Sequence, residues 1–409
     1  MKQIGHPLID VAYGISACLT DKKSLDALTS QDLSESVSKM ETQMKDLQNL
    51  KVLSIYWQNN SLVGINPSQI ESYKKKLHLL TGTPPIFQGF CQICGKEGVF
   101  SDANRSWFPL AAGADADPCT LPGLRGKFLC ADCFRAVVLL PMGCRLCKGG
   151  AYAFHLLDPE LQVEAVSEAT KIISATLLTK AKGNTIIKTA TRLSGRLELL
   201  EIATKSRLWG ASDDGILSRR AEQGATIFSF SNSGTGPSWN QLHLPASALV
   251  FLGVLYKSGQ KEIFLGWAEK SKSLFYDRIC DDIETRQSLA PILAAMVRAR
   301  KTPTLLSEEK DVLKLYEEVA IDKRERFDTL ERIAGYIKGM EDRYRDSFIK
   351  QLSNIRSKRL LLELFRDFEK NSEKTKLRHL TIAELRLLDD ESRGNEVVGL
   401  LYLLCMADE

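Results

Sequence analysis

The sequence has few of the residues, and none of the short motifs, on which common enzyme sites are built. Only five of the 409 residues are histidine, and no two of them stand four positions apart, as zinc hydrolases require. Neither a Gly-x-x-x-x-Gly-Lys-Ser/Thr phosphate loop nor a Gly-x-Ser-x-Gly nucleophile turn is present. No cysteine–histidine arrangement offers a nucleophile either. We therefore expect a protein that is not an enzyme and has no catalytic residues.

Long apolar runs are also missing. The longest, Leu244–Tyr256, has 13 residues and includes Pro245, whereas a helix needs about 20 apolar residues to cross a bilayer. The first residues from Met1 onward lack the apolar segment of a signal peptide. These absences predict a cytoplasmic protein with no membrane partner.

The composition is that of a globular protein, with 44% hydrophobic and 26% charged residues, and the length suffices for two or three domains. A net charge of +4 does not by itself require a nucleic-acid partner, but the charge is unevenly distributed. Residues 170–220 hold ten Lys or Arg against four acids, a local excess of six. These cations suit a surface that follows a phosphate backbone, although a solvated helix face would look the same. The seven singled out for such a surface are Lys180, Lys182, Lys188, Arg192, Arg196, Lys205 and Arg207.

Cysteine is concentrated in one part of the chain, since seven of the ten lie between Cys91 and Cys147. They include three Cys-x-x-Cys pairs, Cys91/Cys94, Cys130/Cys133 and Cys144/Cys147, with Cys119 alone. Without an export signal, such a cluster indicates metal ligation before disulfides. Two thiolates three positions apart can reach one ion, and two such pairs complete a tetrahedron. We expect bound Zn²⁺ with a structural role.

The pairs differ in their surroundings. Gly95 follows Cys94, as in a zinc knuckle, whereas Cys133 is followed by an apolar stretch that predicts a helix whose N-terminus favours thiolate. A knuckle and a pair at a helix start are the ligand plan of a treble-clef zinc site. We therefore take Cys91, Cys94, Cys130 and Cys133 as the first choice of ligands. Cys144 and Cys147 remain alternates, because they form a second knuckle-like pair.

The sequence pattern predicts an α+β protein with four parts. Residues 1–85 form a mixed N-terminal part, with a predicted β-hairpin at 51–57 and 61–65. Residues 86–155 form an inserted treble-clef-like zinc-binding module. Residues 156–300 form a basic α+β part, with a helix starting at Asp158-Pro159, a strand at Ala225–Phe230 and a helix or strand at Pro245–Tyr256. Residues 301–409 form a helical bundle.

Four stretches together resemble a known family. The first is Gly5-His6-Pro7-Leu8-Ile9-Asp10, and the second is the cysteine module with Phe128-Leu129 before Cys130 and Leu140-Pro141-Met142-Gly143 after it. The third runs from Phe228 to Pro237 and on to Leu244-Pro245 and Phe251-Leu252, and the fourth is the helical C-terminal part. They are similar to the large subunit of type I CRISPR Cascade surveillance complexes, in the zinc-bearing branch of types I-A and I-B. The third cysteine pair departs from the four-cysteine pattern expected of that branch.

The resemblance implies a non-catalytic role in reading DNA. In such complexes the guide RNA reads sequence by base pairing, while protein recognises a short flanking motif in duplex DNA and helps to open the strands into an R-loop. The implied partners are CRISPR RNA, target double-stranded DNA, the Cascade backbone and cap subunits, and the helicase-nuclease that destroys the target. The C-terminal bundle is expected to resemble a small subunit. For reading the motif we single out Asn232, Ser233 and Gly234, because glycine permits close backbone approach and asparagine can contact base edges.

Two alternatives from other classes remain open. One is a zinc-finger scaffold that binds only protein partners. The other is a divergent treble-clef nuclease, a class that needs an Asp–His pair and a second histidine near the helix. The helix after Cys133 carries no histidine, and His155 is expected to stand alone.

Overall fold

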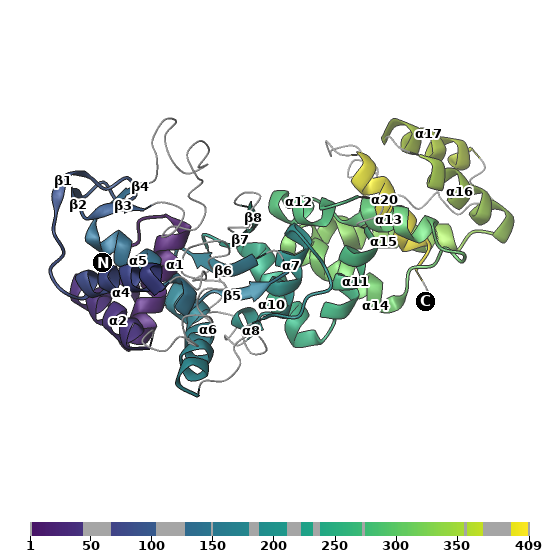
Figure 1. Cartoon of the computed structure of the whole chain (residues 1–409). Helices are drawn as coiled ribbons and strands as arrows, with labels where there is room; N and C mark the ends of the chain where they lie inside the picture. The colour runs from purple at the N-terminus through teal and green to yellow at the C-terminus, as the bar shows by residue number, and fades with distance from the viewer. Residues whose placement is uncertain are drawn as a thin grey trace. The chain divides into compact units, whose positions relative to one another are not determined.

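The computed structural model describes residues 2–43, 67–103, 127–148, 150–179, 188–210, 222–231, 238–271, 275–355, 358–370 and 394–407. The chain forms two compact units, Met1–Ala203 with Ser218–His243, and Thr204–Leu217 with Leu244–Glu409 (Figure 1). Helices and small sheets occur together, which confirms the α+β class, and the C-terminal part is helical as expected. The finer division into four parts stays a prediction.

The first unit is built around α1 (Pro7–Leu19), in which every residue from Leu8 to Ala17 is buried. A helix that is apolar on all sides must be enclosed by other elements. Accordingly, α1 packs against α6 (Pro159–Thr179), α5 (Ala131–Leu139) and α2 (Ser30–Gln43), and α4 (Pro67–Thr81) lies against α2. The resulting core includes side chains from α1, from the cysteine module and from the sheet described next.

A four-stranded sheet completes the first unit, in the order β5 (Arg145–Cys147), β6 (Gly150–Leu156), β7 (Ala225–Ser231) and β8 (Ser238–Leu244). Strand β6 runs antiparallel to both β5 and β7. The strand predicted at Ala225–Phe230 is thereby confirmed as β7.

Two glycines of the first unit allow backbone to approach closely. A Cβ atom on Gly143, after the short helix η2 (Leu140–Met142), would lie 2.3 Å from the Ile15 side chain of α1. Gly150 has φ of +139°, and its Cβ would lie 2.2 Å from the carbonyl oxygen of Phe230 on β7. Any side chain at either position would push the packed elements apart.

Several local predictions from the sequence are confirmed. Helix α6 begins at Pro159, and the Asp158 carboxylate caps it by accepting hydrogen bonds from the Glu160 and Leu161 amides at 2.9 and 2.8 Å. The apolar stretch after Pro245 is helical, as α10 (Ala246–Ser258). The hairpin predicted at 51–57 and 61–65 lies outside the described residues.

Two short pairs of antiparallel strands carry the cysteine module. The first pairs β1 (Phe87–Phe90) with β2 (Glu97–Val99), and the second pairs β3 (Ser101–Ala103) with β4 (Lys127–Leu129), which leads into α5. The turn between β1 and β2 and the helix that begins after Cys130 are the two parts of the predicted ligand plan.

The second unit is helical in the part of it that the structure describes. Helix α7 (Arg196–Lys205) enters it from the first unit, and α8 (Arg207–Gly210) packs against α10. The other elements are α11 (Lys261–Ser271), α12 (Arg278–Thr285), α13 (Ala290–Arg298), α14 (Ser307–Leu315), the π-helical turn η4 (Tyr316–Ala320), α15 (Arg324–Lys338), α16 (Asp342–Asn354), α17 (Lys358–Glu369) and α20 (Gly394–Cys405).

Buried ion pairs hold the second unit together. Arg326 donates to Glu317 at 2.5 Å and to Glu396 at 3.1 Å, which links η4, α15 and α20. The Arg300 guanidinium donates to both oxygens of Glu309, at 2.6 and 2.9 Å. Because breaking one partner of such a pair leaves a buried charge, these contacts fix how the helices meet.

Of the helices within the described ranges, none combines the length and the apolar character that crossing a bilayer requires.

Candidate metal centre

Four cysteine side chains meet between the β1–β2 hairpin and α5. The sulfur atoms of Cys91, Cys94, Cys130 and Cys133 all lie within 4.8 Å of one another. The Sγ atoms of Cys94 and Cys130 are 3.7 Å apart, close to the roughly 3.8 Å edge of a tetrahedron with metal–sulfur bonds of about 2.3 Å. The structure therefore brings together the four residues chosen first from the sequence.

The first pair is positioned by a knuckle between β1 and β2. The Gly95 amide donates to the Cys91 carbonyl at 2.9 Å, and the Cys91 amide donates to the Lys96 carbonyl at 2.9 Å. Gly95 has φ of +70°, a left-handed conformation that glycine adopts without strain. This turn directs the thiols of Cys91 and Cys94 toward the sulfur atoms of Cys130 and Cys133.

The second pair lies at the beginning of α5. Cys130 is the residue before the helix, and its sulfur accepts a hydrogen bond from the Cys133 amide at 3.5 Å. The helix N-terminus carries partial positive charge, which stabilises thiolate at both positions. The Gln92 amide donates to the Phe128 carbonyl at 2.9 Å, which attaches the knuckle to the strand before Cys130.

The four thiols perturb one another strongly. Hydrogen bonds from Cys130 and Cys133 hold the pKa of Cys91 far below the usual thiol range, and a hydrogen bond from Cys133 lowers the pKa of Cys94 to about 7. Cys133 also lowers the pKa of Cys130, but hydrogen bonding to Cys91 and burial outweigh this and raise it to about 12. The pKa of Cys133 is raised well above normal by its hydrogen bonds to the other three sulfurs and by burial.

Mutual hydrogen bonding and burial thus lower the pKa of Cys91 and Cys94 and raise the pKa of Cys130 and Cys133. A divalent metal held by all four thiolates would offset two of their four negative charges in a largely buried place. Four sulfur donors in tetrahedral proximity suit Zn²⁺ or another thiophilic ion. The geometry is compatible with a metal site and does not by itself name the metal.

Charged side chains fix the helix that carries the second pair. Asp132 is buried and accepts hydrogen bonds from Lys96 at 3.0 Å, Ser30 at 3.0 Å and Arg135 at 3.2 Å. Arg135 is also buried, and it donates to the carbonyl oxygens of Leu80 and Gly82, each at 2.8 Å. Since Lys96 follows the knuckle, the Lys96–Asp132 pair joins the two halves of the cysteine cluster.

The third cysteine pair lies outside this cluster within the described part of the chain. Cys144 is enclosed by apolar side chains, and burial raises its pKa to about 12. The Cys147 thiol donates to the Gly150 carbonyl at 3.2 Å, within the turn between β5 and β6. Cys119 is not among the described residues.

The predicted nucleic-acid contacts are only partly visible. Lys180, Lys182 and the stretch Asn232, Ser233 and Gly234 lie outside the described residues. Lys188 and Arg192 are exposed and Arg196 is half-buried, on the segment that leads from the edge of β5 into α7.

Two buried carboxylates hold that segment, and sequence reasoning missed them. Glu198 and Glu201 on α7 have exposed fractions of 1% and 0%. Glu201 accepts hydrogen bonds from the Arg192 and Leu193 amides, each at 3.0 Å. Glu198 accepts from the Lys148 amide at 2.7 Å and from the Thr191 hydroxyl at 2.5 Å. No local signal identifies these partners, because Lys148 lies 50 positions before Glu198.

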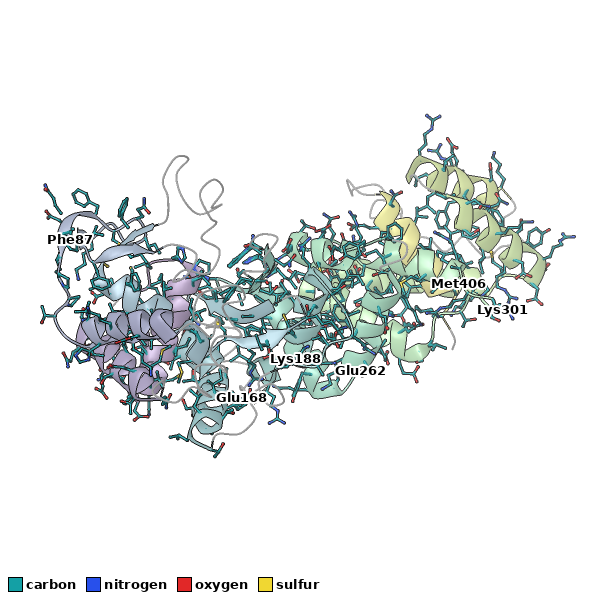
Figure 2. The ribbon with its side chains drawn as sticks, viewed as in Figure 1. Phe87, Glu168, Lys188, Glu262, Lys301 and Met406 are labelled. Carbon is teal, nitrogen blue, oxygen red and sulfur yellow. The ribbon has the colours of Figure 1, made fainter. Side chains whose placement is uncertain are left out.

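An exposed apolar patch on the cysteine module was also missed. Ile86, Phe87, Phe90 and Phe128 are exposed to 67, 61, 69 and 43%, respectively. Figure 2 labels Phe87 on the β1–β2 hairpin. The exposure of neighbouring large apolar side chains is typical of an interaction surface.

The expectation that His155 stands alone is wrong. Its Nε2 atom lies 3.0 Å from Asp10 Oδ2, and both side chains are buried. Asp10 also accepts hydrogen bonds from the Ile4 and Gly5 amides, each at 3.0 Å. Because the partners are 145 positions apart, no local pattern in the sequence indicates the pair. Its burial and its backbone contacts indicate that it ties the N-terminal segment to β6.

Comparisons with protein-family models, with curated proteins and with solved structures found no match to this chain.

Proposed function

We propose that this chain is a non-catalytic, zinc-organised large subunit of an RNA-guided CRISPR surveillance complex. In this role guide RNA reads the target by base pairing, while the chain recognises the motif beside the target, helps to open the duplex and docks the helicase-nuclease. The partners would be CRISPR RNA, target double-stranded DNA and the backbone and cap subunits of Cascade.

One observation carries the proposal. Three of the four stretches that resemble the family are separated by up to 220 residues, yet they contribute to a single core in the first unit. That core contains Leu8 from the first stretch, Cys91 and Cys130 from the second, and Phe228 from the third. Motifs that build one core together support a common fold better than motifs that match separately.

Zinc would be held by Cys91, Cys94, Cys130 and Cys133, with a structural role. When bound, it would supply the cross-link that two strand pairs of three or four residues per strand lack. Metal analysis of the purified chain should find one zinc per molecule. Cys133→Ser should lose it, whereas Cys144→Ser, which changes a buried thiol outside the cluster, should retain it. Protein without stoichiometric zinc would contradict this assignment.

The recognition step can be tested in the assembled complex. Wild-type chain, guide RNA and backbone subunits are offered duplexes with a matched target and a randomised flank, and the bound flanks are sequenced. We expect enrichment of a short motif, and we expect Asn232→Ala to weaken that enrichment while Asn354→Ala on α16 leaves it unchanged. Enrichment that is equal in all three proteins would remove Asn232 from the reading site. No nucleic-acid binding at all would refute the proposed function.

A second candidate is a zinc-organised scaffold that binds only proteins, and the exposed patch of Ile86, Phe87, Phe90 and Phe128 favours it. Retention of the wild-type chain on immobilised DNA separates the two candidates. A scaffold that binds only proteins would not be retained on the DNA at any salt concentration. A protein that contacts phosphates would be retained and would elute at a salt concentration that depends on the number of contacts.

A further inference from the structure

The segment after the third cysteine pair brings cations together from two distant parts of the chain. Lys148 is exposed in the turn between β5 and β6, and its Nζ atom donates to the Arg192 carbonyl at 3.2 Å. Lys188 is exposed beside Leu146 of β5, where the Thr189 amide donates to the Leu146 carbonyl at 2.7 Å. We call Lys148, Lys188 and Arg192 the basic rim; Figure 2 labels Lys188.

The rim is built on a fixed support. Burying a carboxylate is costly unless hydrogen bonds or charges compensate it, and Glu198 and Glu201 are both buried. Their hydrogen bonds go to the backbone on both sides of the rim, at Lys148 and at Arg192. The two carboxylates therefore hold the two parts of the rim in one arrangement. The Cys147 thiol, which donates to the Gly150 carbonyl, shapes the same turn.

The two lysines of the rim, Lys148 and Lys188, are exposed and present positive charge to solvent. Lys148 Nζ donates to a neutral carbonyl, so this contact leaves its charge uncompensated. Arg192 is exposed and pairs with the buried Glu201, with 3.9 Å between Nε and Oε1, so this carboxylate positions the guanidinium. Glu168 on α6 is an exposed acid that pairs with Arg145 at 3.0 Å. Arg145, at the start of β5, is thus partly neutralised and does not count toward the rim.

We propose that the basic rim binds the phosphodiester backbone of a nucleic-acid strand, and that Cys147 of the third cysteine pair serves to shape this site. The proposal rests on the proposed function and names its contact surface. Spaced cations on a fixed support suit successive phosphates, and such contacts position a nucleic acid without reading its sequence.

The test uses the full chain with two labelled probes, a 30-base-pair DNA duplex and a 30-nucleotide RNA strand, over a series of salt concentrations. The variant is Lys148→Gln with Lys188→Gln. The matched control is Lys75→Gln with Lys171→Gln, which removes two exposed charges on α4 and α6. We expect the rim variant to lower affinity by roughly tenfold or more. Its log–log salt slope should fall by about 1.8 on duplex DNA or about 1.4 on RNA, while the control stays near wild type.

The probe whose slope changes identifies the strand that the rim holds. Equal losses in the rim variant and the control would overturn the inference and leave the proposed function standing, because binding would then follow net charge. Wild-type protein that binds neither probe would overturn both.

The variant Glu201→Gln tests whether the rim binds through positioned side chains or only through its net positive charge. This change raises the net charge by one, so a purely electrostatic attraction predicts tighter binding. If the carboxylate positions Arg192, binding should instead weaken by severalfold, with an unchanged circular dichroism spectrum confirming the fold. Tighter binding in a folded Glu201→Gln variant would contradict the inference.

Discussion

Removal of the metal should loosen the strand pairs of the cysteine module while leaving α5 folded. The β1–β2 hairpin has strands of four and three residues, too short to be stable alone, and three of the four residues of β1 are exposed. Helix α5, in contrast, has eight of its nine residues buried and packs against α1 and α2. The metal should therefore contribute mainly to the local stability of the knuckle.

The expected change in amide exchange depends on how much free energy the metal contributes to the stability of the knuckle. Structural zinc binds small modules with an apparent free energy of about 10–16 kcal/mol, whereas a unit of ordinary stability unfolds at about 5–15 kcal/mol. With metal, the knuckle should open only when the whole unit unfolds. Without it, local opening should become easier by at least about 4 kcal/mol, or 1,000-fold in amide exchange rate.

The assay is hydrogen exchange with and without a zinc chelator, read at the Cys91 and Gln92 amides. These donate to the Lys96 and Phe128 carbonyls, each at 2.9 Å. The amides of β6 paired with β7 serve as the internal reference, because the metal does not touch that sheet. Equal protection of the knuckle amides with and without the chelator would refute the reasoning.

Three further predictions concern stability, measured as urea unfolding midpoints. Burial would raise the pKa of Glu309, but hydrogen bonds from Arg300 and the following helix start outweigh this and hold it below 4.5. The carboxylate therefore stabilises the fold above that pH and loses its effect as pH falls through the lowered pKa. Glu309→Gln should cost about 2 kcal/mol at pH 7, and the difference from wild type should shrink at pH 3.5; a constant difference would contradict this. Gly150→Ala should cost about 3 kcal/mol or more because its Cβ would meet a backbone oxygen, whereas Gly266→Ala, in a helix with no atom within 4 Å of the added Cβ, should be neutral or slightly stabilising. Asp10→Ala should cost about 2–4 kcal/mol, because three hydrogen bonds lose this buried carboxylate as their partner; a loss under 1 kcal/mol would show that water replaces it.

Features set by neighbouring residues could be predicted from the sequence. The four cysteines at metal-ligand spacing, the helix after Cys130, the start of α6 at Pro159 and the strand at Ala225–Phe230 all depend on signals within a few positions. The stretch after Pro245 could not be assigned to helix or strand, because a run that is apolar on every face shows neither period.

Features that need a distant partner could not be predicted. Asp10 and His155 are ordinary residues in their local sequence, and only the packing of α1 beside β6 makes them a buried pair. Glu198 and Glu201 resemble a solvated helix face until the fold places backbone amides against them. The exposed phenylalanines were missed for the opposite reason, since an apolar residue in a strand predicts burial.

The central position of α1 has a consequence for how the chain acquires its shape. This helix is synthesised well before two of the helices that cover it, since α5 starts at residue 131 and α6 at residue 159. During synthesis, α5 and α6 can cover the apolar surface of α1 only after more than a hundred further residues have been made. Contacts between such distant segments slow folding and prolong the exposure of aggregation-prone apolar surface. The nascent first unit should therefore bind chaperones readily. A chain truncated between α2 and α6 should not fold, because α1 would lack the helices that cover it.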